Sequence, residues 1–226
     1  MPRRLQREID KLKQRILALG GQVEESLRKA VRSFANQDCD LAHEVINGDS
    51  VIDEMEVDLE EECLKILALY QPVAVDLRFI VAVLKINNDL ERIGDLATHI
   101  AQRALSLAEL DKVQVPAELL TTADRVQRML SKSLDALVNR DVNLALEVCA
   151  EDDQVDDAHR AMYRRIKDGI AQDIADMEWL IQLLSASRYL ERIADQATNI
   201  AEDVVYLIQG DIVRHHVGPP QPVRSE

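Results

Sequence analysis

Apolar residues recur every three or four positions along nearly the whole chain, which is the spacing of an amphipathic α-helix. Proline and turn-forming residues interrupt this pattern at a few places and divide it into separate segments. We therefore predict six helices, at about 3–36, 39–70, 73–109, 117–139, 141–172 and 175–209. The first has the clearest stripe, formed by Leu5, Ile9, Leu12, Ile16, Leu19, Val23, Leu27, Ala30 and Phe34.

Single residues mark several of the predicted boundaries. Asp38 is placed to cap the second helix, because an aspartate carboxylate accepts hydrogen bonds from the exposed N–H groups of a first turn. Gln71 and Pro72 end that helix, since proline cannot continue a helix that begins before it. Gly20 and Gly21 fall inside the first helix and predict a loosened or kinked segment there.

A segment of fourteen residues occurs twice, one hundred positions apart. Residues 88–101 read NDLERIGDLATHIA and residues 188–201 read RYLERIADQATNIA. A second matching pair lies upstream, with LAHEVINGDSVID at 41–53 and LALEVCAEDDQVD at 144–156. Two blocks that repeat in the same order indicate that a unit of about a hundred residues has been duplicated.

The duplication and the helix lengths together predict the fold class. Three helices of about 30 residues, each about 45 Å long and joined by short turns, pack as an up-down-up bundle. We predict an all-α fold of two tandem three-helix bundles related by an internal pseudo-two-fold repeat. Residues 1–110 form the first bundle and 111–209 the second, with a linker from Leu110 to Pro116 and a disordered tail at 210–226.

Composition supports this class and excludes others. Apolar residues make up 47% of the chain and aromatic residues only 3%, which is usage typical of helical proteins. A net charge of −14 argues against a nucleic-acid binder and against broad electrostatic docking on an anionic membrane. No run of residues has the length of a membrane span, and Cys39, Cys63 and Cys149 form no CxxC pair. We expect a soluble cytoplasmic protein.

Acidic residues are paired at a spacing of four in both copies of the repeat. This spacing places the two members of a pair on one helix face, where like charges repel. Two remedies remain open: a bound cation, for which carboxylate oxygens suit Mg, Ca, Mn or Fe, or solvation with ion pairs to Arg92, Arg192, Arg78, Lys85 and Arg188. The pairs are Asp49/Asp53 and Glu91/Asp95 in the first copy, and Asp152/Asp156 and Glu191/Asp195 in the second.

Motifs of common enzyme classes are absent from the sequence. It contains no GxxxxGK[ST], GxGxxG, HExxH or GxSxG segment, and no Glu-x-x-His of the kind that a ferritin-like di-iron centre needs. No nucleophile and base stand out together, so we expect no catalytic activity.

The repeated segments resemble those of the PhoU family. The resemblance rests on INNDLERIGDLATHIA in one half and LERIADQATNIAED in the other, each preceded by an aspartate pair, and on the stretch LALYQPVAVDLRFIVAVLKINNDLERIGD. It extends over about 5–209. The second copy departs more from the family pattern, with Ala194 in place of Gly94.

The resemblance implies a six-helix, two-bundle, non-enzymatic regulator. Members of the family couple a phosphate ABC transporter, through its ATPase, to a phosphate-sensing membrane histidine kinase, and they repress phosphate-starvation genes when phosphate is plentiful. We accordingly expect these two partners, a homodimer, no nucleic acid, and contact with the membrane only through partners. The alternative is a metal-binding bundle with a redox or storage role, against which the missing Glu-x-x-His motifs weigh.

The resemblance also bears on the acidic pairs. The E(D)xxxD motifs of the family are associated with metal clusters on the bundle surface, so all eight carboxylates above are candidate ligands of Fe, Mn, Mg, Ca or Zn. Arg92 and Arg192, which lie inside the repeated motif, are candidates for partner contacts or for holding the acidic pairs in place.

Overall fold

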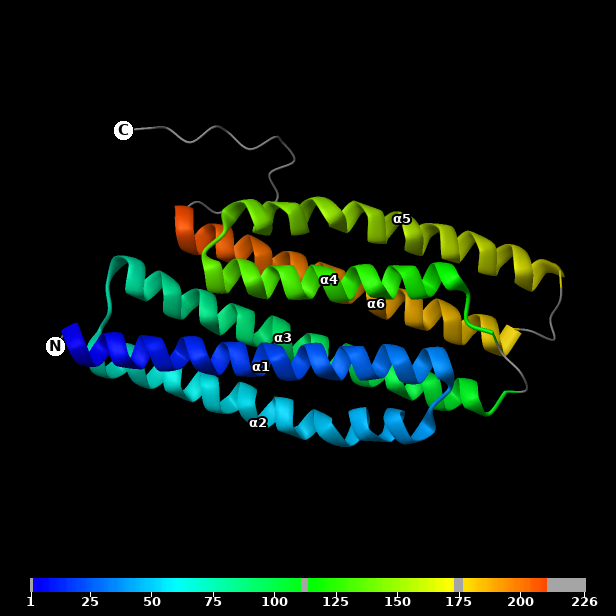
Figure 1. The fold of residues 1–226 in the computed structure, drawn as a ribbon, viewed down its shortest axis with the longest axis horizontal. Coiled ribbons are helices and arrows are strands. Elements are labelled where there is room, and N and C mark those ends of the chain that lie inside the picture. The colour runs from blue at the N-terminus through cyan, green and yellow to red at the C-terminus, as the bar shows by residue number, and fades with distance from the viewer. Residues whose placement is uncertain (1, 111–113, 173–176, 211–226) are drawn as a thin grey trace.

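The computed structural model describes residues 2–110, 114–172 and 177–210. This part of the chain forms six α-helices and contains no strand, so the predicted all-α class is confirmed. The helices are α1 (Pro2–Asn36), α2 (Cys39–Tyr70), α3 (Ala74–Ala108), α4 (Ala117–Asn139), α5 (Val142–Gln172) and α6 (Met177–Gln209) (Figure 1). Among the described residues, no helix is both long enough and apolar enough to cross a membrane.

The chain turns where the sequence predicts it. The Asp38 carboxylate accepts a hydrogen bond from the Leu41 N–H at 3.0 Å and so caps α2. At the other end of α2, Gln71 adopts the left-handed conformation, with φ of 46°, and donates its N–H to the Leu67 carbonyl. Pro72 follows directly. Both predicted boundaries of α2 are therefore confirmed.

Gly20 has a different role from the one that we predicted. α1 runs without a break through Gly20 and Gly21. A Cβ atom at Gly20 would lie only 2.9 Å from the Leu134 Cδ1 atom of α4. The missing side chain therefore lets α1 approach α4 closely. The sequence pattern of α1 alone could not reveal this, because the neighbouring helix belongs to the other half of the chain.

Each half of the chain is a three-helix bundle, and the two bundles pack side by side. α1, α2 and α3 contact one another, as do α4, α5 and α6, while α3 packs along α6 and α1 meets α4 (Figure 1). Phe34 and Ile100 of the first half meet Leu119 and Leu190 of the second around a small apolar cavity. The hydrophobic core is thus continuous between the halves.

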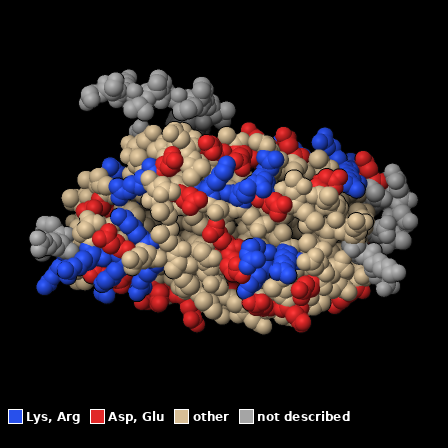
Figure 2. Space-filling view, in the orientation of Figure 1, with Lys and Arg blue, Asp and Glu red and all other residues tan. Residues whose placement is uncertain are grey.

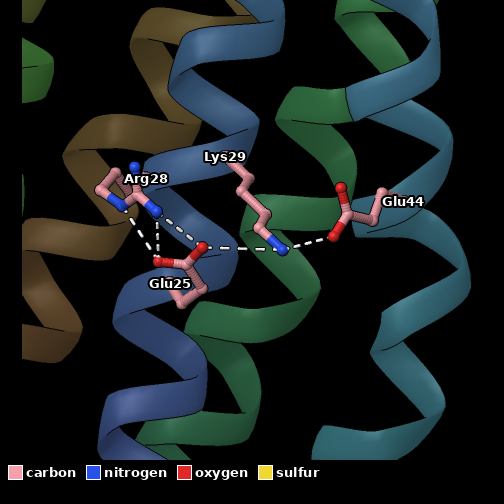
Figure 3. Close-up of polar contacts among 4 residues, drawn as sticks. All are labelled: Glu25, Arg28, Lys29 and Glu44. Carbon is pink, nitrogen blue, oxygen red and sulfur yellow. Dashed lines mark hydrogen bonds and ion pairs between the residues drawn. The ribbon is translucent and has the colours of Figure 1, made fainter.

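Matched ion pairs fasten the first helix of each bundle to the second. Lys29 of α1 lies between Glu25 of the same helix and Glu44 of α2 (Figure 3). Lys132 of α4 occupies the equivalent position and pairs with Glu147 of α5 at 3.6 Å. Surface pairs of this kind contribute about 0–1 kcal/mol each, so they refine the packing and do not cause it. Their recurrence shows that the duplication extends to the surface.

Candidate carboxylate sites on the two bundles

The first acidic cluster lies where α2 and α3 run side by side. The carboxyl group of Asp49 is close enough to Asp53 and Asp95 to respond to their charges. Glu91 likewise responds to Asp95 and Asp53. Two helical pairs, about forty residues apart in the chain, are therefore brought onto one surface.

The second cluster repeats the first between α5 and α6. Asp152 lies near Asp195 and Asp156, and Asp195 lies near Glu191 and Asp156. The structure thus places all eight predicted carboxylates in two groups of four, one on each bundle.

Negative charge in these clusters is incompletely compensated. Burial, followed by the charge of Asp195, raises the pKa of Asp152 to about 6. Burial, followed by the charge of Glu191, raises the pKa of Asp195 to about 6. In the first cluster, burial is also the main cause that raises the pKa of Asp49 and of Glu91. Each cluster would therefore favour a proton or another cation.

Threonine hydroxyls lie beside the clusters at equivalent positions. Thr98 of α3 lies close enough to Asp49, and Thr198 of α6 close enough to Asp152, to lower the pKa of each aspartate against the larger effect of burial. Neither hydroxyl forms a hydrogen bond with a described residue. A hydroxyl next to the ionised carboxylate stabilises its charged form. These two threonines stood in the repeated motif, but nothing in the sequence assigned them to the aspartates.

A partly buried hydrogen bond beside each cluster is a further feature that the sequence pattern did not predict. The Asn87 side-chain amide of α3 donates to the Glu56 carboxylate of α2 at 2.9 Å, and Glu56 adds its charge to the environment of Glu91. At the equivalent place in the second bundle, His159 is 2.9 Å from the Ser187 hydroxyl. Both partners of this hydrogen bond differ between the halves, yet the bond itself is kept. The sequence signal that could have revealed this contact is that both members of the pair change together, from Glu56 and Asn87 in the first copy to His159 and Ser187 in the second.

Arg92 and Arg192 occupy equivalent exposed positions, but their surroundings differ. Burial raises the pKa of Glu91 and of Asp195, and the charge of the neighbouring arginine, Arg92 or Arg192, offsets a part of that rise. Arg92 also lines an open groove of about 650 Å³ between α3 and α6. Elsewhere between α3 and α6, the Tyr189 ring stacks on the ring of His99, with 5.3 Å between the ring centres. Each arginine therefore lies beside the acidic cluster of its own bundle.

Donor chemistry and side-chain positions differ in how well they fit a bound metal. Clustered carboxylates with raised pKa values suit a hard cation. In their present positions, however, no three His, Cys, Asp or Glu side chains of the described residues are arranged to hold one ion. Several of the eight carboxylates are exposed, including Asp53 and Asp95. Rotation of these side chains is therefore required before three oxygens can meet on one ion.

The comparisons with known proteins agree with each other. The PhoU domain model matches residues 16–104 and again 119–204. A phosphate-specific transport system accessory protein PhoU homolog of Pseudomonas aeruginosa is 38% identical over 92% of this chain and 86% of its own length. The corresponding protein PhoU of Escherichia coli is 33% identical, with the same coverage of 92% and 86%.

Solved structures match in shape as well. The crystal structure of PhoU from Pseudomonas aeruginosa superposes with a TM-score of 0.89 at 37% identity, covering 91% of this chain and 99% of that one. The phosphate transport system regulatory protein PhoU from Streptococcus pneumoniae gives 0.86 at 31% identity, covering 92% and 99%. With two matched domains, close relatives and a common fold, the chain belongs to the PhoU family.

Proposed function

We propose that this protein is a non-enzymatic regulator of phosphate uptake and phosphate-starvation signalling. It binds the ATPase of a phosphate ABC transporter and a phosphate-sensing histidine kinase, and it represses the starvation genes when phosphate is plentiful. The observation that carries this proposal is the family membership over both halves of the chain, with relatives whose names place them in the phosphate-specific transport system. In this role the protein acts by occupying partner surfaces and performs no chemistry.

The distribution of charge supports binding of basic partner faces. The chain carries −14 overall, and α2 alone holds ten acidic residues against one lysine. A surface of one sign speeds association with a partner of the other sign, and it makes that association weaken with salt.

A genetic test decides the regulatory role. Deletion of the gene, in a strain with no other PhoU-like protein, is expected to leave the phosphate-starvation genes active in high phosphate. Restoring the intact gene should switch them off, with transcript levels as the measurement. Starvation genes that stay repressed in the deletion strain would rule the role out.

We also propose that each acidic cluster binds a divalent or trivalent cation. The carboxylates of Asp49, Asp53, Glu91 and Asp95 would hold it on the first bundle, and Asp152, Asp156, Glu191 and Asp195 on the second. The bound charge would offset the burial and the mutual repulsion that together raise the pKa values in each cluster. The redox or storage alternative gains no support from these residues, because it needs Glu-x-x-His ligands.

Elemental analysis tests the cation proposal directly. Asp95→Ala is expected to remove metal from the first bundle only, so the bound amount should fall by about half relative to the wild type. Occupancy should also fall as the pH drops below about 6, where Asp152 and Asp195 take up protons. Equal metal content in the wild type and in a variant lacking Asp49, Asp53 and Asp95 would refute the proposal.

A further inference from the structure

The turn between α2 and α3 exposes more apolar side chain than any other described turn of the molecule. Val73 is 75% exposed and Leu69 64%, the two highest values among the large apolar residues described. Val75 and Leu77 continue this surface onto α3, at 49% and 39%. Apolar residues that gather in this way mark contact sites, whereas scattered ones need no explanation.

The backbone of the turn holds these side chains outward. Gln71 and Ala74 both adopt the left-handed conformation, with φ of 46° and 49°, although neither is glycine. Pro72 between them is buried, which anchors the turn. Val73 therefore lies exposed next to a buried proline, on the turn at the end of the bundle.

Basic residues stand at the same end of the molecule. α1 has 35 residues and its counterpart α4 has 23, and the offset of the repeat leaves residues 2–13 of α1 without an equivalent in α4. This extension carries Arg4, Arg7 and Lys11 on the face turned away from the core. Lys11 pairs with Glu8, but Arg4 and Arg7 form no ion pair with any described residue.

The basic extension and the apolar turn lie at the same end of the molecule, at a similar level along the bundle. The Lys13 ammonium lies 5.6 Å from the centre of the Phe79 ring, which sets Lys13 level with the second turn of α3. Because α1 and α3 run in the same direction, the first residues of α1 reach beyond the start of α3 (Figure 1). Basic side chains gather at the end where the chain begins (Figure 2).

We propose that this end of the molecule docks on the surface of an anionic phospholipid bilayer. The aliphatic side chains of Val73, Leu69 and Val75 enter the boundary between headgroups and acyl chains, and Arg4 and Arg7 pair with the anionic headgroups. The inference goes beyond the proposed function, because it gives the chain a membrane contact that does not pass through a partner.

Two observations favour a lipid surface over a protein partner. The exposed large apolar side chains at the turn are Leu and Val, which are under-represented among the residues that dominate the energy of protein–protein contacts. They also project from the end of a helical pair, a shape that a fluid bilayer accommodates. Three of the acidic residues near this end form ion pairs on their own helices, Glu8 with Lys11, Asp10 with Lys13 and Glu62 with Lys65. Asp76 is the one acidic residue of the turn itself and of the first turn of α3.

Vesicle sedimentation with the full-length chain tests the proposal. The protein should sediment with vesicles of phosphatidylglycerol and phosphatidylethanolamine at about 0.1 M salt, and not with vesicles of phosphatidylcholine alone. Val73→Asp, and separately Arg4→Glu with Arg7→Glu, should each lower the bound fraction at least about five-fold. All three positions are exposed, so circular dichroism should show unchanged helix content.

Matched controls separate the turn from general surface charge. Val51→Asp introduces the same side chain at a 46% exposed valine in the middle of α2, and Arg32→Glu reverses an exposed arginine at the far end of α1. Both should bind the anionic vesicles as the wild type does. The proposal is overturned if the wild type fails to bind them, or if the control variants lose as much binding as Val73→Asp. It is also overturned if Val73→Asp abolishes capture of the transporter ATPase but leaves lipid binding unchanged, since the turn would then be a protein interface.

Discussion

At the scale of single residues, Asp152 is held in a position that favours its protonated form. Its pKa is raised from 3.8 to about 6 by burial and by the charges of Asp195 and Asp156. When the pKa of a carboxyl group is higher in the folded than in the unfolded chain, the group stabilises the fold at a pH below its pKa in the unfolded chain. That contribution is lost as the pH rises to the pKa of the group in the folded chain. Between about pH 4 and pH 6, ionisation of Asp152 therefore lowers the free energy of unfolding.

Asp152→Asn should accordingly stabilise the metal-free protein at neutral pH. A raised pKa corresponds to about 1.4 kcal/mol per unit, but Asp152 is only partly buried and solvent screens its charge. We expect the variant to gain about 1 kcal/mol in free energy of unfolding at pH 7.5 and to match the wild type near pH 4. Urea unfolding in the presence of a chelator measures this difference. Asp124→Asn, at an exposed position on α4, serves as the control with a change below about 0.5 kcal/mol. No gain at pH 7.5 would show that the carboxylates are less crowded than their geometry implies.

Positions along the chain were easier to predict than contacts between its parts. Asp38 and Pro72 set the ends of α2 by local rules that need no knowledge of the fold. The i, i+4 spacing likewise placed each acidic pair on one face. The roles of Gly20, Thr98 and Glu56, in contrast, depend on which helix lies opposite, and a single-helix pattern carries no such information.

At the scale of helix pairs, the α2–α3 contact of the first bundle and the α5–α6 contact of the second are filled by different residues. A Cβ atom on Gly94 of α3 would lie 3.2 Å from both Cδ1 and Cγ2 of Ile52 on α2. In the second bundle, the same two positions hold Ala194 and Val155, both buried. The larger residue on one helix is thus matched by a smaller one on the other, which conserves the volume between the helices.

A double-mutant cycle tests this exchange. Gly94→Ala alone should cost about 1 kcal/mol of stability, because overpacking of about 1–3 kcal/mol exceeds the gain of about 1 kcal/mol in helix propensity. Ile52→Val alone should also cost about 1 kcal/mol through the lost methylene. We expect the double variant to lie within about 0.5 kcal/mol of the wild type in urea unfolding. Strictly additive losses would mean that the two positions do not share their space.

At the scale of the whole molecule, the two bundles share one interior. Phe34, Ile100, Leu119 and Leu190 meet between them. A partly exposed ion pair also joins α3 to α6, where the Lys85 ammonium lies 3.0 Å from an oxygen of Asp203, whose side chain is only 2% exposed. A large apolar contact of this kind resists independent movement of its two sides. The repeated units are therefore expected to unfold together, despite their origin in a duplication.

Trp179 allows this cooperativity to be measured from one half of the molecule. It is the only tryptophan of the chain and lies on α6, partly buried against the core, so its fluorescence reports the second bundle. Far-ultraviolet circular dichroism reports helices of both bundles. We expect the two signals to give the same urea midpoint, as two-state unfolding requires.

Lys85→Ala, which removes a partner of the buried Asp203 carboxylate from the first bundle, should lower stability by about 2 kcal/mol and move both midpoints equally. Lys65→Ala, at an exposed pair on α2, should move neither by more than about 0.5 kcal/mol. A circular dichroism signal that falls in two steps, with fluorescence following only one of them, would show that the bundles are separate folding units.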